Sequence, residues 1–291
     1  MMIHPHRHSW LLTVFIIILF FLITWPIWQW LWGEWLGNDY YSHGLLIPFV
    51  AVFLAVRRWQ LHTPRTAQPV LPTTTQERLF VWLRGLWLLI STIAYLCLLY
   101  YKAYYLAGFA MIGMIGGIVW VLGRQALLGL WLFPIGYLLL MVPIPLIERI
   151  TYPLAIFAGL CGGGLVRLFG MDLTIVGNAV TLPNAELVIG AQCSGINSLM
   201  ALTALMVLAA YLVEGPRWAR LSLIIAAMPL AILGNILRIA SLIFVARNYG
   251  ADAAFTFYHD YSGFLFFVSI LLLMIPMTRL LQIKTLRLDV I

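Results

Sequence analysis

Charged residues are scarce in this chain, and their scarcity defines the class of protein. Only 9% of the 291 residues are charged, whereas 63% are hydrophobic. A soluble globular domain carries about 25% charged residues, so a soluble fold is excluded. Several apolar runs reach the ~20 residues that a helix needs to cross the ~30 Å core of a bilayer. The sequence therefore predicts an all-α polytopic membrane protein, forming one integral membrane domain over residues 1–291.

Cysteine is also rare. The chain has three cysteines, Cys97, Cys161 and Cys193, too few and too scattered for a disulfide framework or a metal cluster. Among the six histidines, His4, His6, His8, His43 and His259 show no ligand motif either. We predict no metal and no cofactor. Nucleic acid is not expected as a partner despite the net charge of +7, because basic residues in a membrane protein mostly record its topology.

About eight apolar runs are candidate transmembrane helices. They cover residues 10–32, 45–56 and 83–100, a run returning to Arg124, and residues 127–141, 193–212, 221–245 and 264–277. The first run is too long for a signal peptide and lacks a cleavage site, so we expect a retained span.

Basic residues gather in three places: Arg57, Arg58, Arg65 and Arg78; Arg217 and Arg220; and Arg279, Lys284 and Arg287. The positive-inside rule makes these segments and both termini cytoplasmic. The loop with His43 and the start of the run at Cys193 then lie outside. The run 127–141 also ends outside. Residues 150–169 must therefore return to the side they left, as an interfacial or re-entrant helix.

Residues 172–192 change pattern from helical to extended. Short β-branched runs alternate with the turn pairs Gly177-Asn178 and Pro183-Asn184, which predicts a small extracytoplasmic β-hairpin of two or three strands. Its edge could accept an extended peptide by strand addition, or the sheet could be a structural cap on the helices. Both interpretations remain open.

The polar stretch 191–198 runs from this sheet directly into an apolar helix and carries Cys193. Unpaired N–H groups and the helix dipole at such a start stabilise a thiolate, which is the nucleophilic form of cysteine. The alternative is that Cys193 is a small packed residue. Ser194 and Asn197, which flank it, are candidate supporting or substrate-binding residues.

Arg238 lies inside an otherwise apolar span, where an ionisable residue is a functional candidate. Asn235 precedes it by three residues and shares its helix face, so it is a candidate supporting residue. Arg238 could instead be a structural arginine that reaches the outer interface.

His259 precedes the last span on the expected outer side, together with Cys193 and Arg238. A histidine can accept a thiol proton and protonate a leaving amine, although His259 could also be an ordinary interfacial residue. A thiolate, a proton carrier and a fixed positive charge are the parts needed for acyl transfer through a thioester. The catalytic motifs thus fall within residues 190–263.

These motifs resemble the exosortase/archaeosortase family. The resemblance rests on Gln192-Cys193-Ser194-Gly195-Ile196, Asn235-Ile236-Leu237-Arg238-Ile239 and His259, preceded by Asp39-Tyr40-Tyr41-Ser42-His43-Gly44, Pro48 and Arg57-Arg58.

The resemblance implies a cysteine peptidase/transpeptidase of the bacterial cytoplasmic membrane, with Cys193, Arg238 and His259 as catalytic residues. Its substrates would be secreted proteins with a C-terminal sorting signal: a Pro-Glu-Pro-like motif, a transmembrane helix and a basic tail. The acceptor stays open, as does the role of His43, which could bind substrate, assist His259 or make an interfacial hydrogen bond. Polysaccharide-export proteins would be separate partners. A transporter centred on Arg238 and a non-catalytic export subunit are the alternative functions.

Overall fold

The computed structural model describes the backbone of residues 6–62, 75–283, 285–287 and 290, and their side chains apart from residues 6–12, 62, 75–77, 123–128, 148 and 257–260. His4, Arg65 and Lys284 therefore lie outside the described residues. The chain divides into two compact units, Met1–Pro143 and Ile144–Ile291.

In the first unit, every regular element of the described residues is a helix. Its elements are α1 (His6–Gly37), η1 (Asp39–Leu45), α2 (Leu46–His62), α3 (Thr75–Tyr100), α4 (Tyr104–Tyr137) and η2 (Leu138–Met141). The helices α3 and α4 pack along each other, and α2 packs on α4. Apolar side chains cover much of the outer surface of the helices, as expected where the solvent is lipid.

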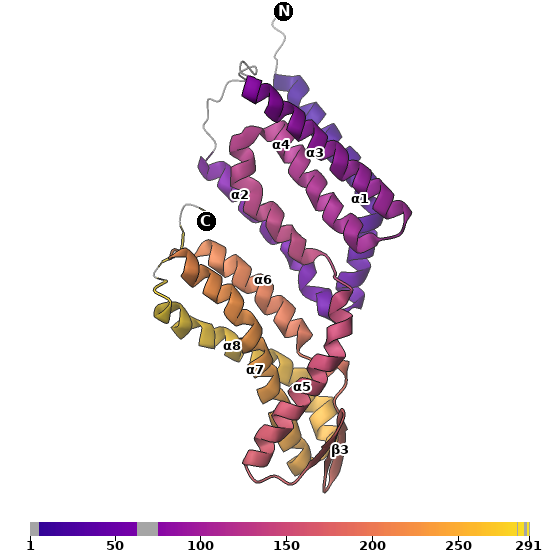
Figure 1. The fold of residues 1–291 in the computed structure, drawn as a ribbon, viewed down its shortest axis with the longest axis vertical. Helices are drawn as coiled ribbons and strands as arrows, with labels where there is room; N and C mark the ends of the chain where they lie inside the picture. The colour runs from indigo at the N-terminus through magenta and orange to yellow at the C-terminus, as the bar shows by residue number, and fades with distance from the viewer. Residues whose placement is uncertain (1–5, 63–74, 284, 288–289, 291) are drawn as a thin grey trace, which may run out of the picture. The chain divides into compact units, whose positions relative to one another are not determined.

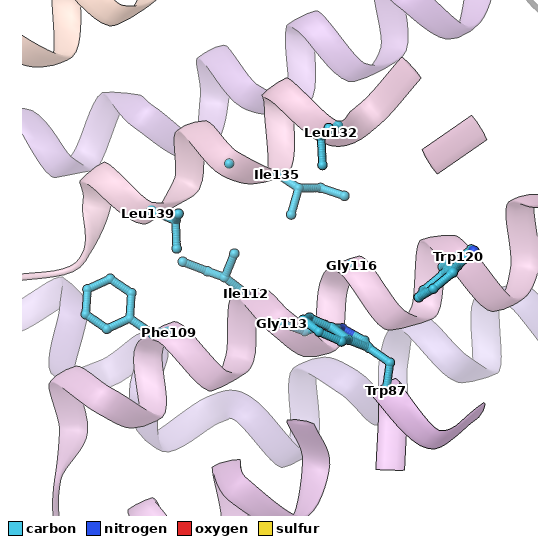
Figure 2. A pocket seen from close by; sticks show the side chains of 10 residues that line it. Trp87, Phe109, Ile112, Gly113, Gly116, Trp120, Leu132, Ile135 and Leu139 are labelled. Carbon is cyan, nitrogen blue, oxygen red and sulfur yellow. The ribbon is translucent and has the colours of Figure 1, made fainter. Parts of the chain in front are cut away.

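The element α4 reverses direction within its length. A Cβ built on Gly116 would lie 4.0 Å from Cγ2 of Ile135, although residues nineteen positions apart in a straight helix are ~28 Å apart. Figure 2 shows the two arms facing each other. The arms correspond to the apolar helices Tyr104–Leu122 and Gly129–Met141, which are the fourth and fifth runs of the sequence.

A cavity of about 450 Å³ lies between these arms and α3. Its walls include Trp87, Ile112, Trp120 and Leu139 (Figure 2). The described residues that line it are apolar or aromatic side chains and glycines, none of which serves acid–base or nucleophilic chemistry.

The second unit combines four long helices with a small sheet (Figure 1). Its elements are α5 (Leu146–Leu168), β1 (Thr174–Val176), β2 (Ala179–Leu182), β3 (Ala185–Val188), η3 (Ala191–Cys193), α6 (Ile196–Leu212), α7 (Arg217–Tyr249), η4 (Ala253–Tyr258), which is π-helical, and α8 (His259–Leu280). The helix α7 is central, because α5, α6 and α8 all pack on it.

The sheet is antiparallel, in the order β1-β2-β3. Its strands are joined at Gly177-Asn178 and Pro183-Asn184, so the predicted turn pairs and extended runs are confirmed. The inner face of the sheet, with Val180 and Leu187, packs on α5 and α7. Asn184 ties the β2–β3 turn to α7, since its Nδ2 donates a hydrogen bond of 2.8 Å to the carbonyl of Arg247.

Two basic segments lie at one end of the second unit. After α8 the chain returns to the loop between α6 and α7, where the Glu214 N–H donates to the Thr285 carbonyl at 2.9 Å and the Arg287 N–H to the Leu212 carbonyl at 2.8 Å. Arg217 begins α7 at this same loop, and Arg279 lies in the last turn of α8. The predicted topology places both basic segments on the cytoplasmic side, so it requires them to lie at the same end of the unit.

The fold class is confirmed as an α-helical polytopic membrane protein with a small sheet. Within the described residues, eight stretches are long and apolar enough to cross a membrane: Thr13–Gly37, Asp39–Leu61, Arg78–Tyr100, Tyr104–Leu122, Arg149–Leu168, Ala191–Leu212, Arg217–Tyr249 and Tyr261–Leu280. This set differs from the predicted one in two segments. Residues 149–168 have the length of a span, whereas Gly129–Met141 is shorter. The re-entrant placement of residues 150–169 stays a prediction, as does the single-domain description of residues 1–291.

Candidate functional site

Cys193 ends a short 3-10 turn that connects the sheet to α6. The Cys193 N–H donates to the Gly190 carbonyl at 2.9 Å, and the Ser194 N–H donates to the Ala191 carbonyl at 3.0 Å. Ser194 is buried, and its hydroxyl accepts a hydrogen bond of 3.3 Å from the Ile196 N–H, which opens α6. The polar stretch thus satisfies N–H groups that a helix start leaves unpaired.

The Cys193 side chain is buried, with 2% of its surface exposed. It belongs to an apolar core that includes Leu187 and Ile189 after the second turn of the sheet, Ala158 of α5, and Ile239 and Ile243 of α7. The other two cysteines differ in environment, because Cys97 is exposed and Cys161 is half-buried.

Asn235 holds the backbone of Cys193 in place. Its side-chain amide donates a hydrogen bond of 2.8 Å from Nδ2 to the Cys193 carbonyl, and the group is buried. Gly195 permits this contact for two reasons. It has φ +72° in the left-handed region, and a Cβ at this position would lie 2.5 Å from Cγ of Asn235. Glycine is therefore required where α7 approaches the cysteine loop.

Arg238 lies one turn after Asn235 on α7, and its guanidinium reaches α8. Nε donates a hydrogen bond of 3.1 Å to Oγ of Ser262, which is 1% exposed. The guanidinium also passes over Gly263, where a Cβ would lie 3.8 Å from Cζ. Arg238 also lies within electrostatic reach of the Cys193 side chain. The structure thus brings Cys193, Asn235 and Arg238 together.

His259 begins α8, three residues before Ser262. Positions 259 and 262 are one helical turn apart, so the backbone at His259 is near the segment that Arg238 contacts. The side chain of His259 lies outside the described residues.

The remaining predicted residues are not joined to this site by described contacts. Asn197 is exposed in the first turn of α6. His43 belongs to η1 in the first unit, where it is half-buried and its imidazole hydrogen-bonds the backbone of Tyr40. Within the described part of the chain, no three His, Cys, Asp or Glu side chains gather as metal ligands.

Ser262 is a site residue that sequence reasoning missed. It lies in the stretch that carries His259, and its spacing of one turn from that histidine is the available signal. A serine in an apolar helix has no unique partner in sequence, so only the fold identifies Arg238 as its neighbour.

These features define a membrane protein whose one buried cysteine lies beside a buried asparagine and a hydrogen-bonded arginine. The model of the transmembrane exosortase family matches residues 32–276, and the chain belongs to this family. The comparison with curated proteins gives no match, and the comparison with solved structures gives none either.

Proposed function

We propose that this protein is a cysteine peptidase/transpeptidase that cleaves secreted proteins at a C-terminal sorting signal. The observation that carries the proposal is the arrangement around Cys193: Asn235 fixes its carbonyl, and Arg238 lies within electrostatic reach of its thiol. Membership of the exosortase family supports the same class of activity.

In the proposed reaction, the Cys193 thiol first gives its proton to His259. The thiolate attacks the carbonyl carbon of the scissile peptide bond, and Arg238 stabilises the negative charge that develops on the carbonyl oxygen. His259 then protonates the departing amine as the C–N bond breaks, which leaves a thioester on Cys193. An acceptor nucleophile attacks the thioester, transfers its proton to His259 and restores the thiolate. Water as acceptor gives hydrolysis, and an amine or a lipid-linked acceptor gives transpeptidation.

The proposed substrate carries a Pro-Glu-Pro-like motif, a transmembrane helix and a basic tail. The orientation of the second unit supports this class. Its basic segments meet at the Glu214–Thr285 end, which the positive-inside rule makes cytoplasmic. Cys193 lies just before the start of α6, at the opposite end of that helix. A substrate helix in the bilayer would present its motif at the outer face of the bacterial cytoplasmic membrane. Separate polysaccharide-export proteins are proposed partners.

The test is expression of the wild-type protein, Cys193→Ala and Cys193→Ser in cells that make a secreted protein with such a C-terminus. Loss of the tail is followed by gel shift, and the amount of enzyme in the membrane is measured in parallel. Cys161→Ala is the matched control, because that cysteine is half-buried in α5 of the same unit. We expect processing by the wild type and the control alone. Unchanged processing by Cys193→Ala would remove the nucleophile and favour a transporter or an export subunit.

A further inference from the structure

The sheet beside Cys193 has two edge strands with different surroundings. The Ile189 N–H donates to the Asn178 carbonyl at 2.8 Å, which extends the β2–β3 ladder by one pair. Hydrogen-bonded and non-hydrogen-bonded pairs alternate in an antiparallel ladder. Leu187 and Ala185 therefore direct their backbone groups to β2, and Glu186 and Val188 direct theirs to the outer edge of β3.

The outer edge of β1 is closed by α5. The same alternation places the backbone groups of Leu173 and Ile175 on this edge. The Arg167 guanidinium donates to the Leu173 carbonyl from Nε at 3.2 Å and from Nη2 at 2.8 Å. The Ile175 side chain, on the inner face of the sheet, contacts Gly163 of α5 so closely that a Cβ there would collide with it. The Leu173 carbonyl on this edge is therefore already occupied by Arg167, and α5 packs against the strand.

The outer edge of β3 is open. Glu186 is exposed, and Val188 has 55% of its surface exposed. Within the described residues, the outward N–H and C=O groups of Glu186 and Val188 have no hydrogen-bond partner. Proteins usually cover or interrupt an edge strand, because unpaired backbone groups attract another chain. Here only the edge far from the cysteine loop is covered.

The open edge leads to the nucleophile. Val188 lies five residues before Cys193, and β3 runs toward the turn that carries it. An extended chain paired with β3 would thus pass from the sheet to Cys193 without crossing another element of the sheet.

We propose that the extended segment of the substrate preceding its transmembrane helix adds to β3 as a parallel strand. This inference rests on the proposed function and assigns its substrate-binding element. Backbone hydrogen bonds to Glu186 and Val188 hold the segment, as in other cases of strand addition.

The parallel direction follows from what comes after each strand. β3 is followed by Cys193 and then by α6, which enters the apolar part of the unit. A substrate segment running the same way brings its scissile bond to Cys193 and its helix into the bilayer beside α6. An antiparallel segment would direct the substrate helix away from the start of α6.

Cross-linking between cysteines tests the proposal in the full chain. The background is Cys97→Ser, Cys161→Ser and Cys193→Ala, in which the substrate is bound and not cleaved. Val188→Cys and, separately, Glu186→Cys are combined with single cysteines along the substrate motif, and disulfides are formed with copper phenanthroline. The matched control is Val176→Cys, because Val176 is an exposed valine on the closed edge strand β1.

We expect Val188→Cys to cross-link at least about tenfold more than Val176→Cys, because β1 would lie about 14 Å from the added strand and a disulfide requires Cα atoms within ~7 Å. In a parallel register, the substrate position that pairs with Glu186→Cys precedes the one that pairs with Val188→Cys by two residues. Equal cross-linking at positions 176 and 188, or the reverse order of partners, would overturn the proposal.

A processing assay in the same cells separates this inference from the proposed function. If the Cys193-containing enzyme does not process the substrate, the proposed function fails. If it processes the substrate and Val188→Cys cross-links no better than Val176→Cys, strand addition fails and the peptidase proposal stands.

Discussion

Polar side chains that hydrogen-bond across the fold have different roles in the two compact units. In the first unit, aromatic and arginine N–H or O–H groups donate to backbone carbonyls of other helices or other parts of the unit, as in Trp35 to Met141, Tyr95 to Ile23, Trp87 to Gly113 and Arg58 to Leu130. In the second unit, Asn235 and Arg238 of one helix are directed to the cysteine loop and to Ser262. The first pattern fastens helices together, whereas the second gathers polar side chains beside one thiol, which we propose to be the nucleophile.

This difference predicts that changes near Cys193 affect processing, and that comparable changes in the first unit affect stability.

The largest effect should come from the nucleophile itself. We expect Cys193→Ala to lower processing by at least ~10³-fold, because no other group can form the thioester. The gel-shift assay, normalised to membrane protein level, measures this loss. Retained processing by Cys193→Ala would show that the contacts around this thiol do not serve catalysis.

The second effect concerns the fixed charge. We expect Arg238→Lys to lower processing by about 10²-fold, because an ammonium cannot keep the hydrogen bond to Ser262 and act at the oxyanion in the same geometry. Arg247→Lys is the control on the same helix, since the Arg247 guanidinium contacts Asn184 at the exposed turn of the sheet. Similar losses in both variants would assign Arg238 a structural role.

The third prediction compares two glycines at close approaches, one in each unit. A Cβ on Gly195 would collide with Asn235, and a Cβ on Gly44 would collide with the indole of Trp35. We expect Gly195→Ala to lower processing about tenfold, because the left-handed conformation and the displaced Asn235 disturb the cysteine loop. Gly44→Ala should lower the thermal stability of the purified protein and leave processing per folded molecule unchanged. Equal losses of processing would contradict the division of roles.

A smaller effect is expected at Ser262. Ser262→Ala removes one hydrogen bond to Arg238 and should lower processing about fivefold, while Ser262→Thr restores it. Ser269→Ala on α8 is the control, because the Ser269 hydroxyl donates only to the Leu265 carbonyl of its own helix. If threonine does not rescue processing, the hydroxyl is not what positions Arg238.

The smallest effect is expected at His43. His43→Gln should leave processing within about twofold of the wild type, because its imidazole is engaged with the Tyr40 backbone and an exchange of one partly buried hydrogen-bonding group changes little. A tenfold loss of processing would show that His43 of the first unit contributes to the reaction. It would contradict the division of roles between the two units.

Much of the fold follows from sequence because it depends on local periodicity. Long apolar runs mark the helices, and the turn pairs Gly177-Asn178 and Pro183-Asn184 divide the strands at the observed positions. Periodicity did not decide which of two segments has the length of a span. Residues 127–141 were predicted as a span, whereas in the structure residues 149–168 have that length and Gly129–Met141 is shorter. Length and glycine content conflict in these segments, and parity of the loops was the only criterion available to decide between them.

The candidate site was only partly predictable for a similar reason. The residue types of Cys193, Arg238 and Asn235 are unusual in apolar surroundings, so they stand out in the sequence. Ser262 does not stand out, because serine is common in membrane helices and its importance arises from contact with Arg238.

The sequence by itself determined that this chain crosses a membrane, which segments are helical or extended, and which thiol follows the sheet. Only the tertiary structure decided that Asn235 holds the Cys193 carbonyl across 42 residues of chain, that Arg238 binds Ser262, and that Arg167 closes one edge of the sheet and leaves β3 open. These contacts depend on how each helix is rotated and how closely the backbones approach. Hydrophobic periodicity specifies which face of an element is buried, and it does not specify the partner of each side chain on that face.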